Sequence, residues 1–144
     1  MIRLDEIPED VAEKAKLMVV SYPNNPTTAM APDSFYEELI AFASRHDIIV
    51  LHDNAYSDLV FDGRTCGSFL GFPGAKEVGV EFNSLSKTYG LAGARIGFCL
   101  GNEAVVSRIK LLKSNMDYGM FLPIQAAAIA AITGDQSCVH TTDR

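Results

Sequence analysis

The chain has 144 residues, of which 48% are hydrophobic and 21% charged, a balance typical of a folded domain with a sizeable core. Its net charge of −6 argues against a nucleic-acid partner, because such a partner requires a basic face. The longest nearly apolar run, 121–132, is too short to span a bilayer, and the first residues lack the pattern of a signal peptide. The three cysteines have no metal-ligand spacing, so we expect free thiols in a cytoplasmic protein.

The first half of the chain is typical of alternating helices and strands. The clearest helix places Phe35, Leu39 and Phe42 on one side, with Pro32 at its start. A continuous apolar run after this helix is typical of a strand buried on both faces of a sheet. In chain order we expect a helix over 8–16, a strand over 17–20, a helix over 33–45 and a strand over 48–51.

The second half predicts two further strands and a helical end. The connection between these two strands is too short for a parallel crossover, so we expect them to run antiparallel. Together the elements predict an α/β fold of three layers, with a mostly parallel sheet and one antiparallel strand. In order we expect a glycine-rich loop over 62–75, strands over 78–82 and 94–100, helices over 102–113 and 123–133, and the start of a helix over 135–144.

Polar side chains follow three of the predicted strands. In α/β sheets, ligands bind beyond the carboxyl ends of the parallel strands. Because the antiparallel strand begins at that same edge, its first polar residue joins the cluster. The sequence therefore predicts a binding site at this edge, made by Asn25, by Asp53 with Tyr56, by Ser84 with Lys87, and by Arg95.

Part of this cluster suits a phosphorylated ligand. Arg95 could bind a phosphate with its forked guanidinium, and the hydroxyls of Ser84 and Ser86 could add further donors. The amine of Lys87 could form an imine with an aldehyde.

The rest of the cluster suits an aromatic ring that carries a basic nitrogen. Asp53 could pair with a cationic ring nitrogen, while Tyr56 and Asn25 could donate hydrogen bonds to a phenolate-like oxygen. Pyridoxal phosphate carries all of these groups, and its protonated ring acts as an electron sink for a carbanion. Taken alone, the residues indicate a phosphorylated ligand and leave the Schiff base open.

Four stretches, in this order along the chain, carry a resemblance to a known family. They are Asn25-Pro26-Thr27, Asp53-Asn54-Ala55-Tyr56, Ser84-Leu85-Ser86-Lys87 and the arginine eight positions beyond that lysine. With them the sequence resembles the large domain of class I/II (fold-type I) aminotransferases that depend on pyridoxal phosphate. The subgroup with diaminopimelate, alanine and aromatic aminotransferases is the most similar, and the resemblance covers nearly the whole chain.

The resemblance implies a role for each residue of the cluster and names the substrates. Lys87 would be the catalytic residue that forms the Schiff base and then shuttles a proton. The substrates would be an amino acid and a 2-oxo acid, with no nucleic acid or membrane partner. The implied cofactor contacts are Asp53 to the ring nitrogen, Tyr56 and Asn25 to the ring oxygen, and Ser84, Ser86 and Arg95 to the phosphate.

The resemblance also implies that 1–144 is part of a large domain, truncated at both ends, without the small domain of the family. Its outer strands would expose unpaired edges, so we expect a homodimer or higher association. Two alternatives stay open: a β-eliminating lyase on the same scaffold, and a non-catalytic remnant that binds the cofactor. A nicotinamide dehydrogenase is disfavoured, because no strand is followed by a Gly-x-Gly-x-x-Gly turn. Thr28 departs from the family, which often has glycine there.

Overall fold

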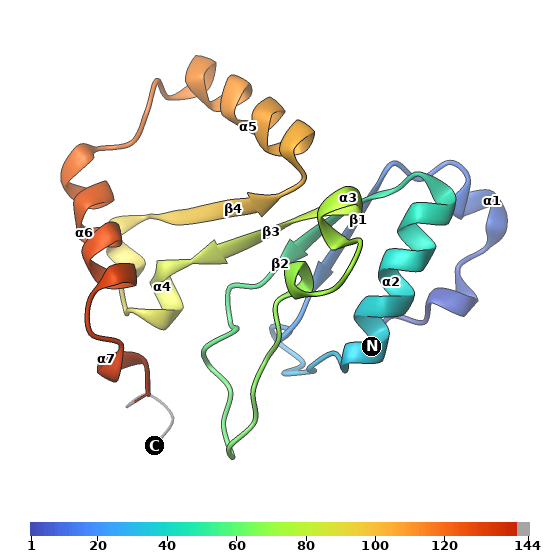
Figure 1. Cartoon of the computed structure of the whole chain (residues 1–144), viewed down its shortest axis with the longest axis horizontal. Helices are drawn as coiled ribbons and strands as arrows, with labels where there is room; N and C mark the ends of the chain where they lie inside the picture. Colours follow the sequence, from blue (N-terminus) through green and yellow to red (C-terminus); the bar gives the residue numbers. More distant parts are fainter. Residues whose placement is uncertain (141–144) are drawn as a thin grey trace.

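A computed structural model describes residues 1–140 and contains one four-stranded sheet (Figure 1). The strands lie side by side in chain order, with β1, β2 and β3 parallel and β4 antiparallel to β3. The predicted α/β class and the single antiparallel pair are therefore confirmed. The strands are β1 (Leu17–Ser21), β2 (Ile49–Asp53), β3 (Gly79–Ser84) and β4 (Gly97–Gly101).

Helices connect and flank these strands. The long helices expected over 33–45 and 102–113 are present and extend slightly beyond the predicted ends. The α-helices are α1 (Glu9–Ala12), α2 (Asp33–His46), α3 (Ala75–Val78), α4 (Leu85–Thr88), α5 (Glu103–Met116), α6 (Leu122–Thr133) and α7 (Ser137–His140). Short 3-10 helices span η1 (Leu4–Glu6), η2 (Phe69–Gly71) and η3 (Ala92–Ala94).

Three local predictions differ from the structure. The strand expected over 94–100 begins only at Gly97, because Ala94 belongs to the short helix η3. The helix expected over 8–16 is only α1, which is followed by a hydrogen-bonded turn in which Ala15 donates its backbone N–H to the carbonyl of Val11 before β1 begins. The strand expected to begin at Val78 begins at Gly79, since Val78 closes the short helix α3. The glycine-rich loop before it contains η2, which brings Phe69 into the core.

The main core lies between α2 and one face of the sheet. Phe35, Tyr36 and Leu39 of α2 are buried against this face, where Val20 and Val50 meet them from β1 and β2. Complete burial of such side chains contributes roughly 1.5–3 kcal/mol each. This packing fixes β1 and β2 relative to each other and thereby sets where their carboxyl ends lie.

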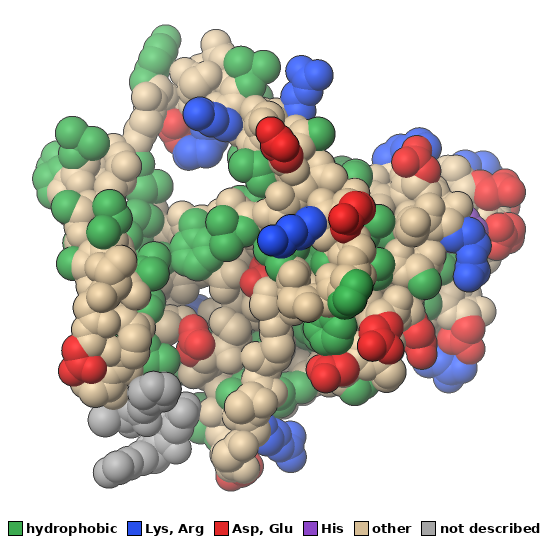
Figure 2. Space-filling view, in the orientation of Figure 1, with side chains coloured by type: hydrophobic (Ala, Val, Ile, Leu, Met, Phe, Trp, Pro, Cys, Tyr) green, Lys and Arg blue, Asp and Glu red, His purple; other side chains and the backbone are tan. Residues whose placement is uncertain are grey.

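The opposite side of β1 is much less covered. Leu17 and Val19 expose 61% and 67% of their surface, although parallel sheets are normally buried on both faces. The apolar helix α6 is also poorly covered, because Ala128 is its only buried residue. Apolar side chains gather over α6 and the nearby part of the sheet in Figure 2. Among residues 1–140, no helix has the length and apolar character needed to cross a membrane.

We expect this chain to self-associate through the exposed edge of β1. A charged side chain on an edge strand opposes pairing with another chain, so Val19→Lys should lower the associated fraction with little effect on stability. Sedimentation velocity across a concentration series measures this fraction. Thr65→Lys, in an exposed loop, is the matched control. A wild-type chain that stays monomeric at high concentration would contradict the expectation.

Candidate functional site

The predicted site residues lie at the carboxyl ends of the parallel strands. Asp53 is the last residue of β2 and Ser84 the last of β3, and these two strands run in the same direction. Tyr56 and Lys87 follow each strand end by three residues. Gly97, the first residue of β4, pairs with Ser84, so the segment that carries Arg95 enters the sheet at this same edge. All of these residues therefore share one edge of the sheet.

Three segments that are distant in sequence meet at Tyr56. The side-chain amide of Asn25 donates a hydrogen bond to the Tyr56 hydroxyl at 3.1 Å. The ammonium of Lys87 lies 5.4 Å from the centroid of the Tyr56 ring, within the range of a cation–π contact. The structure therefore brings Asn25, Tyr56 and Lys87 together through direct contacts.

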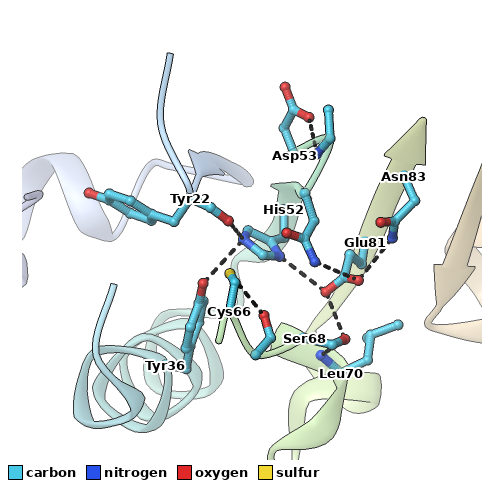
Figure 3. Close-up of polar contacts among 12 residues, drawn as sticks. Tyr22, Tyr36, His52, Asp53, Cys66, Ser68, Leu70, Glu81 and Asn83 are labelled. Atoms are coloured by element: carbon cyan, nitrogen blue, oxygen red, sulfur yellow. Dashed lines mark hydrogen bonds and ion pairs between the residues drawn. The ribbon is translucent and has the colours of Figure 1, made fainter. Parts of the chain in front are cut away.

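Asp53 is exposed at the end of β2. One carboxylate oxygen, Oδ1, accepts a hydrogen bond from the backbone N–H of Ala55 at 3.3 Å, which stabilises the turn after the strand. Its neighbour His52 points to the opposite face, as side chains alternate along a strand. Figure 3 shows Asp53 directed away from the buried contacts of His52. In the described part of the chain, no hydrogen bond engages the second carboxylate oxygen, so it can accept one from a ligand.

The three residues predicted to bind a phosphate reach the same edge, but no contact joins Arg95 to either serine within residues 1–140. The Ser84 hydroxyl accepts a hydrogen bond from the backbone N–H of Ser86 at 3.2 Å and so caps α4. The guanidinium of Arg95 donates to the carbonyl of Ala92 at 3.0 Å. Arg95 itself has a left-handed backbone with φ of 53°, which is uncommon for a residue with a side chain.

The charged groups at this edge are available to an external ligand. Asp53, Lys87 and Arg95 are exposed, and in the described part of the chain none of them takes part in an ion pair. One carboxylate and two cations suit a ligand with a basic ring nitrogen, an aldehyde and a phosphate. The donor set at this edge therefore fits pyridoxal phosphate.

A hollow of about 530 Å³ adjoins the Asn25–Tyr56 contact. Apolar side chains form much of its wall, and the charged residues Asp62 and Arg64 also line it. Sequence reasoning missed these lining residues, because nothing in a loop sequence tells which side chains face a cavity. The remaining lining residues are Pro23, Asn24, Pro26, Thr28, Met30, Leu59, Val60 and Phe61.

A buried polar network lies beneath the strand ends (Figure 3). Its centre is the carboxylate of Glu81 on β3, which is only 4% exposed. Burial alone would raise the pKa of Glu81, but hydrogen bonds from four side chains outweigh it and lower the pKa to about 2. Sequence analysis did not single out Glu81. The feature that could have indicated it is a charged residue at a strand position whose side chain faces the core. The four donors are His52, Asn54, Asn83 and Ser68.

Comparison with known proteins identifies the class. The sequence family described as aminotransferase class I and II matches residues 1–143, so the chain belongs to this family. It is 53% identical over 141 residues to an LL-diaminopimelate aminotransferase from Syntrophobacter fumaroxidans. It is also 49% identical over 127 residues to the glutamate-pyruvate aminotransferase AlaC from Escherichia coli.

Solved structures show the same fold. BacF from Bacillus subtilis in a substrate-bound form matches the whole chain with a TM-score of 0.96 and 40% identity. A probable N-succinyldiaminopimelate aminotransferase from Thermus thermophilus matches 98% of the chain with a TM-score of 0.93 and 38% identity. The chain spans 36% of the Syntrophobacter relative, 31% of AlaC and 36% of the BacF chain. It is thus similar to about a third of each full-length relative.

We expect the stability of the chain to depend on Glu81 at acid pH. Because its pKa is lowered from 4.5 to about 2 by folding, its contribution is complete above pH 4.5 and is lost as the pH falls toward 2. Glu81→Gln should therefore lower the free energy of unfolding by about 3 kcal/mol at pH 7 and flatten its decline below pH 4.5. Urea unfolding at a series of pH values measures both effects. Glu77→Gln, at an exposed position of α3, should keep the wild-type acid decline.

The backbone of Thr28 lies in the left-handed region. This β-branched residue has a φ of 57°, which costs free energy because its side chain crowds the backbone there. Glycine adopts this conformation without strain. Thr28→Gly should therefore raise the free energy of unfolding by about 1 kcal/mol. Thr65→Gly, at a loop position without positive φ, should not, and an equal gain in both variants would exclude strain as the cause.

Proposed function

We propose that this chain is the cofactor-binding part of an aminotransferase that uses pyridoxal phosphate to move an amino group between an amino acid and a 2-oxo acid. The observation that supports this most directly is the contact of the Lys87 amine with Tyr56, which Asn25 also binds, beside the exposed carboxylate of Asp53. Membership of the aminotransferase family supports the reaction class. The chemistry of the individual residues and their common edge support the roles that the family resemblance implies for them.

When bound, pyridoxal phosphate supplies an aldehyde for covalent attachment and a ring that accepts electrons from a carbanion. The amine of Lys87 would hold the aldehyde and, once released, would carry a proton between substrate atoms. Asp53 would keep the ring nitrogen protonated through its charge. The Tyr56 hydroxyl and the Asn25 amide would donate to the ring oxygen.

The phosphate would be bound where β3 ends and β4 begins. The hydroxyl of Ser84 still has a proton to donate while it caps α4, and Ser86 adds a second hydroxyl. Arg95 would contribute a guanidinium, whose forked donors match phosphate oxygens.

The relatives support a proposal for the substrates, and the exposed surface supports one for the oligomeric state. The curated relatives are named as aminotransferases for LL-diaminopimelate and for glutamate with pyruvate, which supports an amino acid and a 2-oxo acid as substrates. The uncovered face of β1 supports a homodimer or a higher association. We also propose a cytoplasmic location, in which the thiols of Cys66 and Cys99, free among residues 1–140, would stay reduced.

The decisive test is covalent capture of the cofactor on Lys87. The chain is mixed with pyridoxal phosphate, treated with borohydride and digested, and the modified peptide is located by mass spectrometry. We expect nearly all of the reducible adduct on Lys87 and its loss in Lys87→Ala, because the nucleophile has been removed. Lys76→Ala, which removes an exposed lysine on α3, should leave the adduct unchanged. Labelling spread evenly over several lysines would contradict the proposal.

A further inference from the structure

The carboxylate of Glu81 accepts four side-chain hydrogen bonds, two on each oxygen. Oε2 accepts from Nδ1 of His52 at 3.2 Å and from the Ser68 hydroxyl at 2.9 Å. Oε1 accepts from the amides of Asn54 and Asn83 at 3.1 Å and 2.9 Å. A carboxylate with all four positions occupied holds each donor in a fixed direction.

Three of these four donors adjoin predicted site residues. His52 and Asn54 lie immediately before and after Asp53 at the end of β2. Asn83 immediately precedes Ser84 at the end of β3. The fourth donor, Ser68, comes from the loop before η2 and has no such neighbour. Most donors in this network are therefore direct sequence neighbours of the candidate site residues.

The network also reaches the first strand. Nε2 of His52 lies 3.2 Å from the backbone carbonyl of Tyr22, which directly follows β1 and precedes the turn that carries Asn25. The backbone N–H of Asn54 donates to the carbonyl of Phe82 at 2.9 Å and joins β2 to β3 just beyond the last strand pair. The backbone bond ties the end of β2 to the end of β3, and the His52 ring packs against the segment that follows β1 beneath the site (Figure 3).

We propose that Glu81 is a positioning residue for the cofactor site: through His52, Asn54 and Asn83 it sets the directions in which Asp53 and the Ser84–Lys87 turn leave their strands. This inference rests on the proposed function. Asp53 must meet a ring nitrogen while Lys87 meets an aldehyde on the same ring, so the relative placement of two strand ends decides whether one ligand satisfies both. Small displacements of such groups strongly weaken binding and catalysis.

The orientation of Asn54 supports this assignment. Its side-chain oxygen is buried and has no hydrogen-bond partner among the described residues, so the amide is held by its nitrogen alone. The carboxylate accepts only an N–H, and it therefore selects this orientation of the amide. The contact with Glu81 therefore fixes the side chain of the residue that directly follows Asp53.

Two variants separate positioning from a general contribution to stability. Asn54→Ala removes the donor that flanks Asp53, whereas Ser68→Ala removes a donor to the same carboxylate from the remote loop. Both should lower stability. The first readout needs no cofactor: amide hydrogen exchange at residues 54 and 55 should speed up in Asn54→Ala about tenfold more than at the core residue Val50, which reports only the loss of global stability. In Ser68→Ala the amides of 54 and 55 should keep wild-type exchange.

The second readout is the absorbance titration of each variant with pyridoxal phosphate. We expect Asn54→Ala to weaken cofactor affinity about tenfold relative to Ser68→Ala, and the absorbance maximum of the bound cofactor to shift only in Asn54→Ala. Equal effects of both variants in exchange and affinity would overturn the positioning role. If the wild-type chain binds no cofactor, the proposed function fails for this chain, while the exchange experiment still decides whether Glu81 directs the strand ends.

Discussion

The parallel pairing of β2 with β3 is the constraint on which the rest of this structure depends. Because the two strands run in the same direction, Asp53 and Ser84 end at one edge, and everything that follows them is confined to that edge. The antiparallel β4 then returns Arg95 to the same place. Backbone hydrogen bonding between strands therefore suffices to bring a carboxylate, an amine and a guanidinium to one edge, without any side-chain contact.

The buried carboxylate of Glu81 adds precision to this arrangement. Backbone pairing sets which residues lie at the edge, but the directions in which the chain leaves each strand depend on local contacts. His52, Asn54 and Asn83 supply those contacts from both strands, and their hydrogen bonds keep Glu81 ionised although it is buried. The edge therefore combines an exposed set of charged groups with a rigid polar support on the opposite face.

Much of this edge could be predicted from the sequence, because it follows from short-range patterns. The apolar runs before Asp53 and Ser84 indicate strands, and the length of the connection to β4 excludes a parallel crossover. The contacts could not be predicted in the same way. The meeting of Lys87 with Tyr56, and of Glu81 with four donors, depends on strand register and on side-chain directions, which no local pattern records. The unfavourable φ of Thr28 was visible only as a departure from glycine in the family.

The short connection between β3 and β4 has a consequence for ligand size. Lys87 and Arg95 both lie within it, and its two ends are held together where Leu85 donates its backbone N–H to the carbonyl of Ile96. The separation of amine and guanidinium is therefore set by a local closed loop and not by the packing of distant segments. A ligand that contacts both groups must therefore match the distance between them. This limit on ligand length does not depend on which other segments pack against the sheet.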